Sequence, residues 1–548
     1  MKWGLEMSRI QILDCTLRDG GYVNGWDFGE ENIKRISERV ACSNVEIIEC
    51  GFLSQTGDAS KNKSIYASVG EAEEYFKNVQ SNALALMVNC GEFSVESIAK
   101  YSGGKIGIIR IAFHKHQREE AQRLCKALKE NGFKVFFQPM YTLGYSDFEL
   151  LDLINWANQN SPDAFYIVDS FGTMRGSDIL RIYYLIDNNL SDKIKIGFHS
   201  HNNLQLSFSN AQALLELHSK RDIIIDTSVL GMGRGAGNLC TELMTQYINE
   251  NIESKYDLIP ILETMDEYIM PIYSLHPWGY SAPYYIAAIN GCHPNYATYL
   301  INRQSLYIKD INKIVKSIPI GKRHLFDKEF ISKLYIEYQS HNINDSKAIE
   351  SISRLCENKK VLVLAPGKSL LTFRGIIAKF IERESPVVIA INHIPKYYKY
   401  DKIFISNIKR FKSLDADIGL IENKLICTSN LSVNRNICLV NYSDYLNEDE
   451  VIYDNAGLML INVLKKAGVN EIALAGYDGF DYANSKNYFD VELANNVNMQ
   501  RQAETNAAIK NYFDKMSRST GFNFITPTIY QPNQQLYDSC LDMGKEPT

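Results

Sequence analysis

Short apolar runs alternate with longer amphipathic stretches through the first part of the chain. The β-branched runs predict eight strands, at Arg9–Asp14, Val45–Cys50, Ala83–Val88, Ile106–Ala112, Val135–Met140, Phe165–Asp169, Ile194–His199 and Ile223–Val229. The stretches between them predict helices, including Glu30–Val40, Gln117–Glu130 and Asp147–Asn158, the last with Ser146 as its N-cap. Eight strands alternating with helices over about 250 residues predict a (β/α)8 TIM barrel, with a doubly wound open sheet as the competing architecture.

The strand pattern stops after residue 255. Ile, Leu and Tyr at helical spacing then predict a helical extension over residues 256–345, with helices at Ile259–Met270, Leu306–Ile318 and Lys328–Gln339. The stretch Ser340–Asn358 is polar and weakly patterned, so a boundary is expected there. We therefore expect a barrel domain at 1–255, the helical extension at 256–345 and a third part at 346–548.

The third part has α/β character of a Rossmann-like kind. Strands are expected at Lys359–Leu364, Val387–Asn392, Asp401–Ser406 and Glu471–Ala475, with a helix at Leu458–Gly468. The first strand runs into A-P-G-K-S-L, residues 365–370. A full P-loop requires a Gly five residues before Gly367, and this chain has none there. The alternative is a looser glycine turn, where backbone N–H groups at a helix N-terminus could hold a phosphate.

Composition narrows the class of protein. The 548 residues are 45% hydrophobic and 22% charged with a net charge of −6, which is typical of a soluble globular protein without a broad nucleic-acid surface. No membrane span or signal peptide is evident. The eleven cysteines are odd in number and include no C-x-x-C pair, which favours reduced thiols over disulfides. We expect a cytoplasmic homo-oligomer with no nucleic-acid partner.

Four motifs follow predicted strands at the same end of the expected barrel. The first strand continues into L-D-C-T-L-R-D-G-G, with Arg18 and Asp19, and the second strand ends at Glu49. The seventh ends in G-F-H-S-H-N-N, with His199 and His201. The eighth is followed by L-G-M-G-R-G-A-G-N, which ends at Asn238. The carboxyl ends of barrel strands are where TIM-barrel chemistry occurs, so a shared site is expected.

The H-x-H spacing predicts a metal site. Side chains two apart on a strand point the same way, so both imidazoles would face the barrel mouth. With an Asp from another strand they form a mixed N/O set that suits Mg²⁺ or Mn²⁺. Such an ion polarises the carbonyl of a chelating 2-oxo acid and stabilises its enolate, and Arg18 could add a second positive donor. The plainer readings are an incidental H-x-H, a surface turn at R-D-G and a structural carboxylate at Glu49.

Together these motifs resemble the DRE-TIM metallolyase superfamily, over roughly residues 9–245. Its members include hydroxymethylglutaryl-CoA lyase, isopropylmalate synthase and 4-hydroxy-2-oxovalerate aldolase. V-D-S-F-G (Val168–Gly172) and I-R-I-A (Ile109–Ala112) are most similar to the oxovalerate aldolases. The loop after the last strand lacks the catalytic Cys of the acyl-CoA lyases, since Cys240 comes only after Asn238. The resemblance favours an aldolase.

The resemblance also implies roles for individual residues. Asp19, His199 and His201 would hold the metal, with Asn238 as a further ligand. Arg18 would stabilise the enolate, and Glu49 would support the site by hydrogen bonding.

The chain departs from the aldolase pattern at one position. The oxovalerate aldolases have a catalytic His two residues after the Gly of R-D-G, and here that residue is Tyr22. A phenol is a weak base at neutral pH but can donate a proton. Either Tyr22 relays the proton or another group does, with His114, His116, Tyr280 and His293 as unranked candidates. The aldehyde half of the substrate is not specified by the sequence.

The third part has a weaker resemblance, confined to residues 365–370, 390–392 and 455–478. These pieces look similar to the Rossmann-like domains of bacterial sialyltransferase-type glycosyltransferases and of the pterin-diphosphokinase-like family. That likeness implies a nucleotide-linked ligand, with the following candidate binding residues: Gly367, Lys368, Ser369, Asn392 and Asp478. A degenerate domain used only for assembly is the alternative.

The main hypothesis is a divalent-metal-dependent aldolase or lyase acting next to a 2-oxo acid, with a role in sugar or surface-glycan synthesis through the fused domain. The alternatives are a nucleotide-dependent transferase with an accessory barrel and a non-catalytic scaffold.

Overall fold

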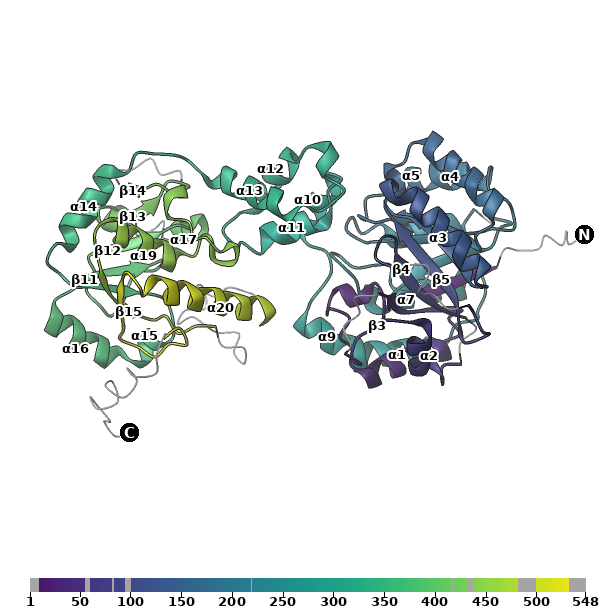
Figure 1. Ribbon diagram of the computed structural model, residues 1–548, viewed down its shortest axis with the longest axis horizontal. Helices are drawn as coiled ribbons and strands as arrows, with labels where there is room; N and C mark the ends of the chain where they lie inside the picture. Colours follow the sequence, from purple (N-terminus) through teal and green to yellow (C-terminus); the bar gives the residue numbers. More distant parts are fainter. Residues whose placement is uncertain are drawn as a thin grey trace, which may run out of the picture. The chain divides into compact units, whose positions relative to one another are not determined.

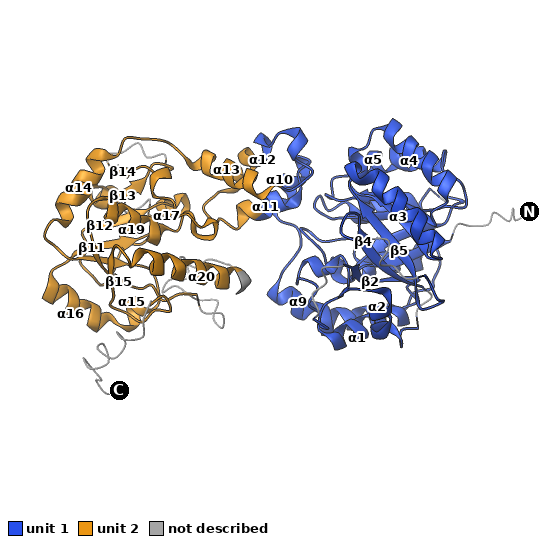
Figure 2. Ribbon diagram, viewed as in Figure 1, with its two compact units in different colours: residues 1–298, 315–326 blue, residues 299–314, 327–548 orange. Residues whose placement is uncertain are grey.

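The computed structural model describes residues 9–54, 60–80, 83–93, 100–217, 219–414, 418–431, 437–480 and 499–531. The chain forms two compact units (Figure 2), the first made of Met1–Thr298 and Val315–Phe326 and the second of Tyr299–Ile314 and Asp327–Thr548. The segment expected as a helical extension, 256–345, is divided between these units. The domain limits at 255 and 345 stay predictions.

The first unit contains a closed barrel of parallel strands. Its strands are β1 (Ile10–Asp14), β2 (Ile47–Leu53), β4 (Ala83–Asn89), β5 (Ile106–Phe113), β6 (Lys134–Pro139), β7 (Ala164–Asp169), β8 (Lys195–Ser200) and β9 (Ile223–Thr227). Each pairs with the next, and β1 pairs with both β9 and β2. This closure confirms the TIM barrel and excludes the open sheet. A short strand that was not predicted, β3 (Ile65–Tyr66), pairs with the end of β2.

Helices surround these strands (Figure 1). They are α1 (Glu30–Cys42), α2 (Val69–Phe76), α3 (Arg118–Glu130), α4 (Asp147–Asn160), α5 (Gly176–Asp187), α6 (Ser207–Leu215) and α7 (Thr241–Asn251). Ser146 is the N-cap of α4, because its side chain accepts a hydrogen bond from the Glu149 N–H. Alternate strand residues contribute to two cores. Ile12 packs with the helices, whereas Leu13, Phe136 and Tyr166 pack with one another inside the barrel.

Helices also fill the segment after the barrel. They are α8 (Ile259–Thr264), a π-helical turn (Met265–Ile269), α9 (Met270–Leu275), α10 (Ala282–Ile289), α11 (Pro294–Ile301), α12 (Ile308–Ser317) and α13 (Lys328–Gln339). The π-helical turn interrupts the single helix expected at Ile259–Met270. Among the described residues, no helix is both long enough and apolar enough to cross a membrane.

The second unit has a sheet of seven parallel strands. Their order is β14 (Cys438–Val440), β13 (Leu425–Thr428), β12 (Lys402–Ile405), β11 (Val387–Ile391), β10 (Val361–Leu364), β15 (Glu471–Ala475) and β16 (Gly521–Phe524). Its helices are α14 (Ser346–Cys356), α15 (Ser369–Thr372), α16 (Arg374–Glu384), α17 (Ile408–Ser413), α18 (Ile418–Ile421), α19 (Ala456–Lys466) and α20 (Met499–Met516). Alternate residues of β10 enter different cores, Val361 in one and Leu362 in the other, so both faces of the sheet are covered. The α/β prediction is confirmed.

The stretch Ser340–Asn358, where a boundary was expected, contains helix α14. Ile352 and Cys356 of this helix are buried, and Ile349 and Leu355 pack against the same core.

Candidate active site

Three side chains predicted to bind metal converge at the carboxyl end of the barrel. Asp19 lies in the loop after β1, His199 lies in β8 and His201 follows it directly. One ligand atom from each lies within 4.8 Å of the other two, and all three residues are buried. The two imidazoles are perpendicular, with ring centroids 5.3 Å apart. A possible metal site is therefore present where H-x-H spacing on one strand predicted it.

Asn238 lies beside Asp19 in this cluster. Its Nδ2 donates to Asp19 Oδ2 at 2.6 Å and to the Met232 carbonyl at 3.0 Å. Its Oδ1 is buried and has no hydrogen-bond partner. Two imidazole nitrogens, a carboxylate and a free amide oxygen fit an octahedral ion such as Mn²⁺ or Mg²⁺.

A buried carboxylate orients the first histidine. Asp226 Oδ2 lies 3.0 Å from His199 Nδ1, which leaves Nε2 of the ring available to a metal. Burial raises the pKa of Asp226, but the charge of Arg110 and the hydrogen bond from His199 outweigh it and hold the pKa below its ordinary value. Arg110 is fully buried, pairs with Asp226, and donates to Glu49 Oε2 at 2.6 Å. The sequence had predicted no role for Asp226 or Arg110.

Arg18 links the metal-binding residues to this buried network. Its Nη1 donates to Asp19 Oδ1 at 2.6 Å and its Nε to Glu49 Oε2 at 2.7 Å. Its Nη2 is buried without a partner. The guanidinium is therefore fixed by two carboxylates and keeps one nitrogen that can donate to a substrate oxygen. Glu49 contacts both Arg18 and Arg110, as a supporting carboxylate would.

Tyr22 lies beside the same site, at the end of a 3-10 turn, Gly20–Tyr22. Burial raises the pKa of its phenol above the ordinary value, although Arg234 opposes that shift. Tyr22 therefore keeps its proton at neutral pH and can act as a donor but not as a base.

A cavity of about 570 Å³ extends outward from this cluster. His114, His116 and His293 line it, whereas Tyr280 is not among its lining residues. His324, which the sequence did not predict as a site residue, also lines the cavity. Burial lowers the pKa of both His114 and His293, so both are neutral at pH 7.

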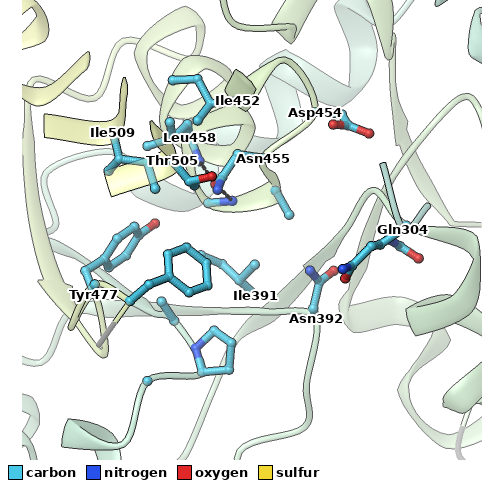
Figure 3. A pocket seen from close by; sticks show the side chains of 18 of the residues that line it. Gln304, Ile391, Asn392, Ile452, Asp454, Asn455, Leu458, Tyr477, Thr505 and Ile509 are labelled. Carbon is cyan, nitrogen blue, oxygen red and sulfur yellow. Dashed lines mark hydrogen bonds between the residues drawn. The ribbon is translucent and has the colours of Figure 1, made fainter. Parts of the chain in front are cut away.

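The second unit has its own cavity, of about 250 Å³, at the carboxyl ends of β10, β11, β12 and β15. Strand order reverses between β10 and β15, and ligands of open α/β sheets bind at such a switch point. Apolar side chains including Ile391, Leu458 and Ile509 lie on one side (Figure 3), and Gln304, Asn392 and Asp454 lie on the other. The lining also includes three arginines, Arg303, Arg410 and Arg501.

Three of the five candidate nucleotide-binding residues line this second cavity, namely Gly367, Asn392 and Asp478. Lys368 is exposed, and neither it nor Ser369 is among the lining residues. The Ser369 N–H donates to Asp478 Oδ2 at 2.9 Å. A carboxylate therefore occupies the helix N-terminus at which a phosphate was expected.

Comparison with known proteins is consistent with this geometry. Residues 9–267 match the family model described as HMGL-like. A 4-hydroxy-2-oxovalerate aldolase from Geobacillus genomosp. 3 is 27% identical over 266 residues, which cover 48% of this chain and 77% of the relative. An enzyme of the same name from Carboxydothermus hydrogenoformans is 27% identical over 269 residues, covering 48% and 78%.

A solved structure is also similar to the first half of the chain. It is the N-terminal domain of a Bacteroides vulgatus protein assigned as an aldolase, with 26% identity and a TM-score of 0.47, covering 53% of this chain and 96% of that one. Residues 9–267 thus form an HMGL-like domain of the DRE-TIM superfamily of aldolases and lyases.

Proposed function

We propose that the barrel is a divalent-metal-dependent aldolase, which makes or breaks the C–C bond next to the carbonyl of a 2-oxo acid. The observation that carries this proposal is the convergence of Asp19, His199 and His201, with the unpartnered oxygen of Asn238 beside them. The names of the relatives support the same class of reaction.

The residues present suit each step of an aldol reaction. Asp19, His199, His201 and Asn238 would hold the ion, which supplies Lewis-acid polarisation of the oxo-acid carbonyl when bound. The free nitrogen of Arg18 donates to the oxygen that becomes negative as the enolate forms. In the synthetic direction, the methyl carbon of the oxo acid loses a proton and bonds to the aldehyde carbon. The aldehyde oxygen gains a proton, and the product is a 4-hydroxy-2-oxo acid.

Tyr22 is our candidate for the group that protonates the aldehyde oxygen. Its phenol lines the cavity and keeps its proton at neutral pH. The neutral imidazoles of His114 and His293 line the same cavity, and they are our candidates for moving protons to and from the methyl carbon.

Exchange of pyruvate methyl protons with deuterated water tests enolate formation without needing the aldehyde. We expect NMR to detect exchange with Mn²⁺ and none after chelation. Asp19→Ala or His199→Ala should slow it by more than about a hundredfold, since even changes outside the metal ligands cost 10–100-fold. His276→Ala is the matched control, because His276 is not among the cavity's lining residues. Exchange that persists in metal-stripped protein would contradict the proposal.

We also propose that the cavity of the second unit binds a nucleotide-type ligand. Its place at a switch point, its three arginines and its apolar wall of Ile391, Leu458 and Ile509 suit a molecule with both a phosphate and a flat ring. An activated sugar is one such ligand, and it would connect the aldolase to sugar or surface-glycan synthesis. Nucleotide-dependent group transfer is the corresponding second function.

Calorimetric titration of the full chain with CMP, UMP and AMP tests this second proposal. Saturable binding is expected, weakened by Arg501→Gln on the order of tenfold because a charged hydrogen bond is lost. Arg383→Gln, a change at an exposed arginine that pairs with Glu384, is the control. The absence of saturable binding by all three nucleotides would rule the proposal out.

A further inference from the structure

Arg234 lies near the barrel site, and its guanidinium group is not paired with a carboxylate. It belongs to the glycine-rich loop after β9, is half-buried, and lines the 570 Å³ cavity. Its Nε is buried without a hydrogen-bond partner, and in the described part of the chain no acidic group pairs with it. Its guanidinium carbon lies 5.1 Å from the centroid of the Tyr22 ring, a cation–π contact that holds it in place.

The other cationic groups of this cavity already have partners. Arg18 is bound by Asp19 and Glu49, and Lys115 pairs with Glu149 at 2.7 Å. An unpaired, partly desolvated guanidinium is costly unless an anion joins it. Arg234 therefore offers this cavity a second site for an oxyanion, besides the free Nη2 of Arg18.

Arg234 lines the same cavity as the metal-binding cluster and as His293. Burial raises the pKa of Asp19, but the charges of Arg18, of the two histidines and, last, of Arg234 outweigh it and hold the pKa low. An anion bound to Arg234 would thus share this cavity with an oxo acid held at the metal-binding residues.

This cavity is large and has an aromatic wall. The Tyr141 ring is tilted against the rings of Phe171 and His324, with centroid distances of 4.6 Å and 4.4 Å. A cavity of about 570 Å³ falls in the range of sites for drug-sized ligands, well above the size of a three-carbon oxo acid with a two-carbon aldehyde. The second substrate therefore has room for a longer chain.

We infer that the aldehyde acceptor carries an anionic group, a carboxylate or a phosphate, which Arg234 binds while Tyr22 positions the guanidinium. This inference rests on the proposed aldolase function and names the class of its second substrate. Arg234 is a specificity-determining residue in this scheme. Arg234 contacts only the acceptor, so its loss lowers kcat/KM for charged aldehydes and leaves kcat/KM for uncharged aldehydes unchanged.

Matched pairs of aldehydes test the inference, with pyruvate and Mn²⁺ held constant. Glyceraldehyde 3-phosphate is compared with glyceraldehyde, and succinic semialdehyde with pentanal, by following product formation with NMR. We expect the wild type to favour one anionic aldehyde over its neutral partner by at least about tenfold in kcat/KM, and the favoured pair identifies phosphate or carboxylate. Arg234→Gln should lower kcat/KM for that aldehyde by about 10–100-fold, because a charged hydrogen bond is lost.

Two further variants separate charge from folding. Arg234→Lys keeps the positive charge and should retain part of the preference, so the inference stays testable if Arg234→Gln folds poorly. Arg181→Gln changes an exposed arginine on α5 that pairs with Asp147, and it should not alter the preference.

The outcomes distinguish this inference from the proposed function. If wild-type protein with Mn²⁺ exchanges no pyruvate protons, both are wrong. If exchange occurs but neither anionic aldehyde outperforms its neutral partner, only the acceptor assignment is wrong. A rise in KM for pyruvate that is equal with charged and neutral aldehydes would place Arg234 on the oxo acid and overturn the inference.

Discussion

Asp226 is the residue on which the geometry of the proposed metal site most depends. Its two oxygens receive three donors: His199 Nδ1 at 3.0 Å, the Tyr166 hydroxyl at 3.1 Å, and Arg110. The variant Asp226→Asn loses the negative charge that pairs with Arg110 and that makes the His199 ring a stronger ligand, so it supports His199 less well. We expect Mn²⁺ affinity to fall about 10–100-fold, measured by calorimetric titration.

A matched substitution controls for charge removal on the same strand. Asp222 precedes β9 at its opposite end and lies 3.8 Å from Lys195, so Asp222→Asn should leave the affinity unchanged. Equal losses in the two variants would show that Asp226 acts only through net charge.

Asp14 gives the barrel a pH-dependent stability. Burial raises its pKa from 3.8 to about 6, although hydrogen bonds from Thr16 and Thr241 oppose the shift. Between these values the folded chain binds a proton that the unfolded chain does not, so stability falls as pH rises from 4 to 6. In Asp14→Asn the Thr241 hydroxyl can accept a hydrogen bond from the new amide while it donates one to the Thr227 hydroxyl. No buried polar group is therefore left without a hydrogen-bond partner.

Relative to wild type, Asp14→Asn should therefore gain about 2–3 kcal/mol of unfolding free energy between pH 4 and pH 7. Urea unfolding at several pH values measures this difference. A difference that is constant with pH would show that Asp14 does not titrate in this range.

The sequence predicted those site residues that lie on a single strand or within a single motif. His199 and His201 converge because side chains two apart share a strand face, and the R-D-G motif contributed Asp19. The contacts among Glu49 on β2, Arg110 on β5 and Asp226 on β9 depend instead on which side chains meet across a closed barrel. Arg110 gave two signals, its place in the I-R-I-A motif and its charge in the middle of an apolar strand, and neither indicated its partners.

At the scale of elements, predictability followed length and burial. The barrel strands have five to eight residues, most of them buried, and each was predicted within a few residues of its ends. Strands β13, β14 and β16 have only three or four residues and were missed, although β10 and β12, with four residues each, were predicted. The 18-residue helix α20 was also missed, because its sequence is polar.

At the scale of the whole molecule, each unit has its own hydrophobic core. The buried cluster that includes Leu153 lies between barrel and helices, and the cluster that includes Leu464 lies against the second sheet. The four tryptophans, at positions 3, 26, 156 and 278, all belong to the first unit. Tryptophan fluorescence therefore reports unfolding of the barrel unit, whereas far-UV circular dichroism reports both units.

Separate cores predict separate unfolding transitions. Leu464→Ala and Leu153→Ala each remove a fully buried side chain from a helix, at a cost of about 2–5 kcal/mol. Leu464→Ala should move part of the circular dichroism transition to lower urea and leave the fluorescence midpoint unchanged, while Leu153→Ala should lower the fluorescence midpoint. If Leu464→Ala lowered the fluorescence midpoint as much as Leu153→Ala does, the two units would unfold as one cooperative body, because destabilisation of the second core would then be transmitted in full to the barrel.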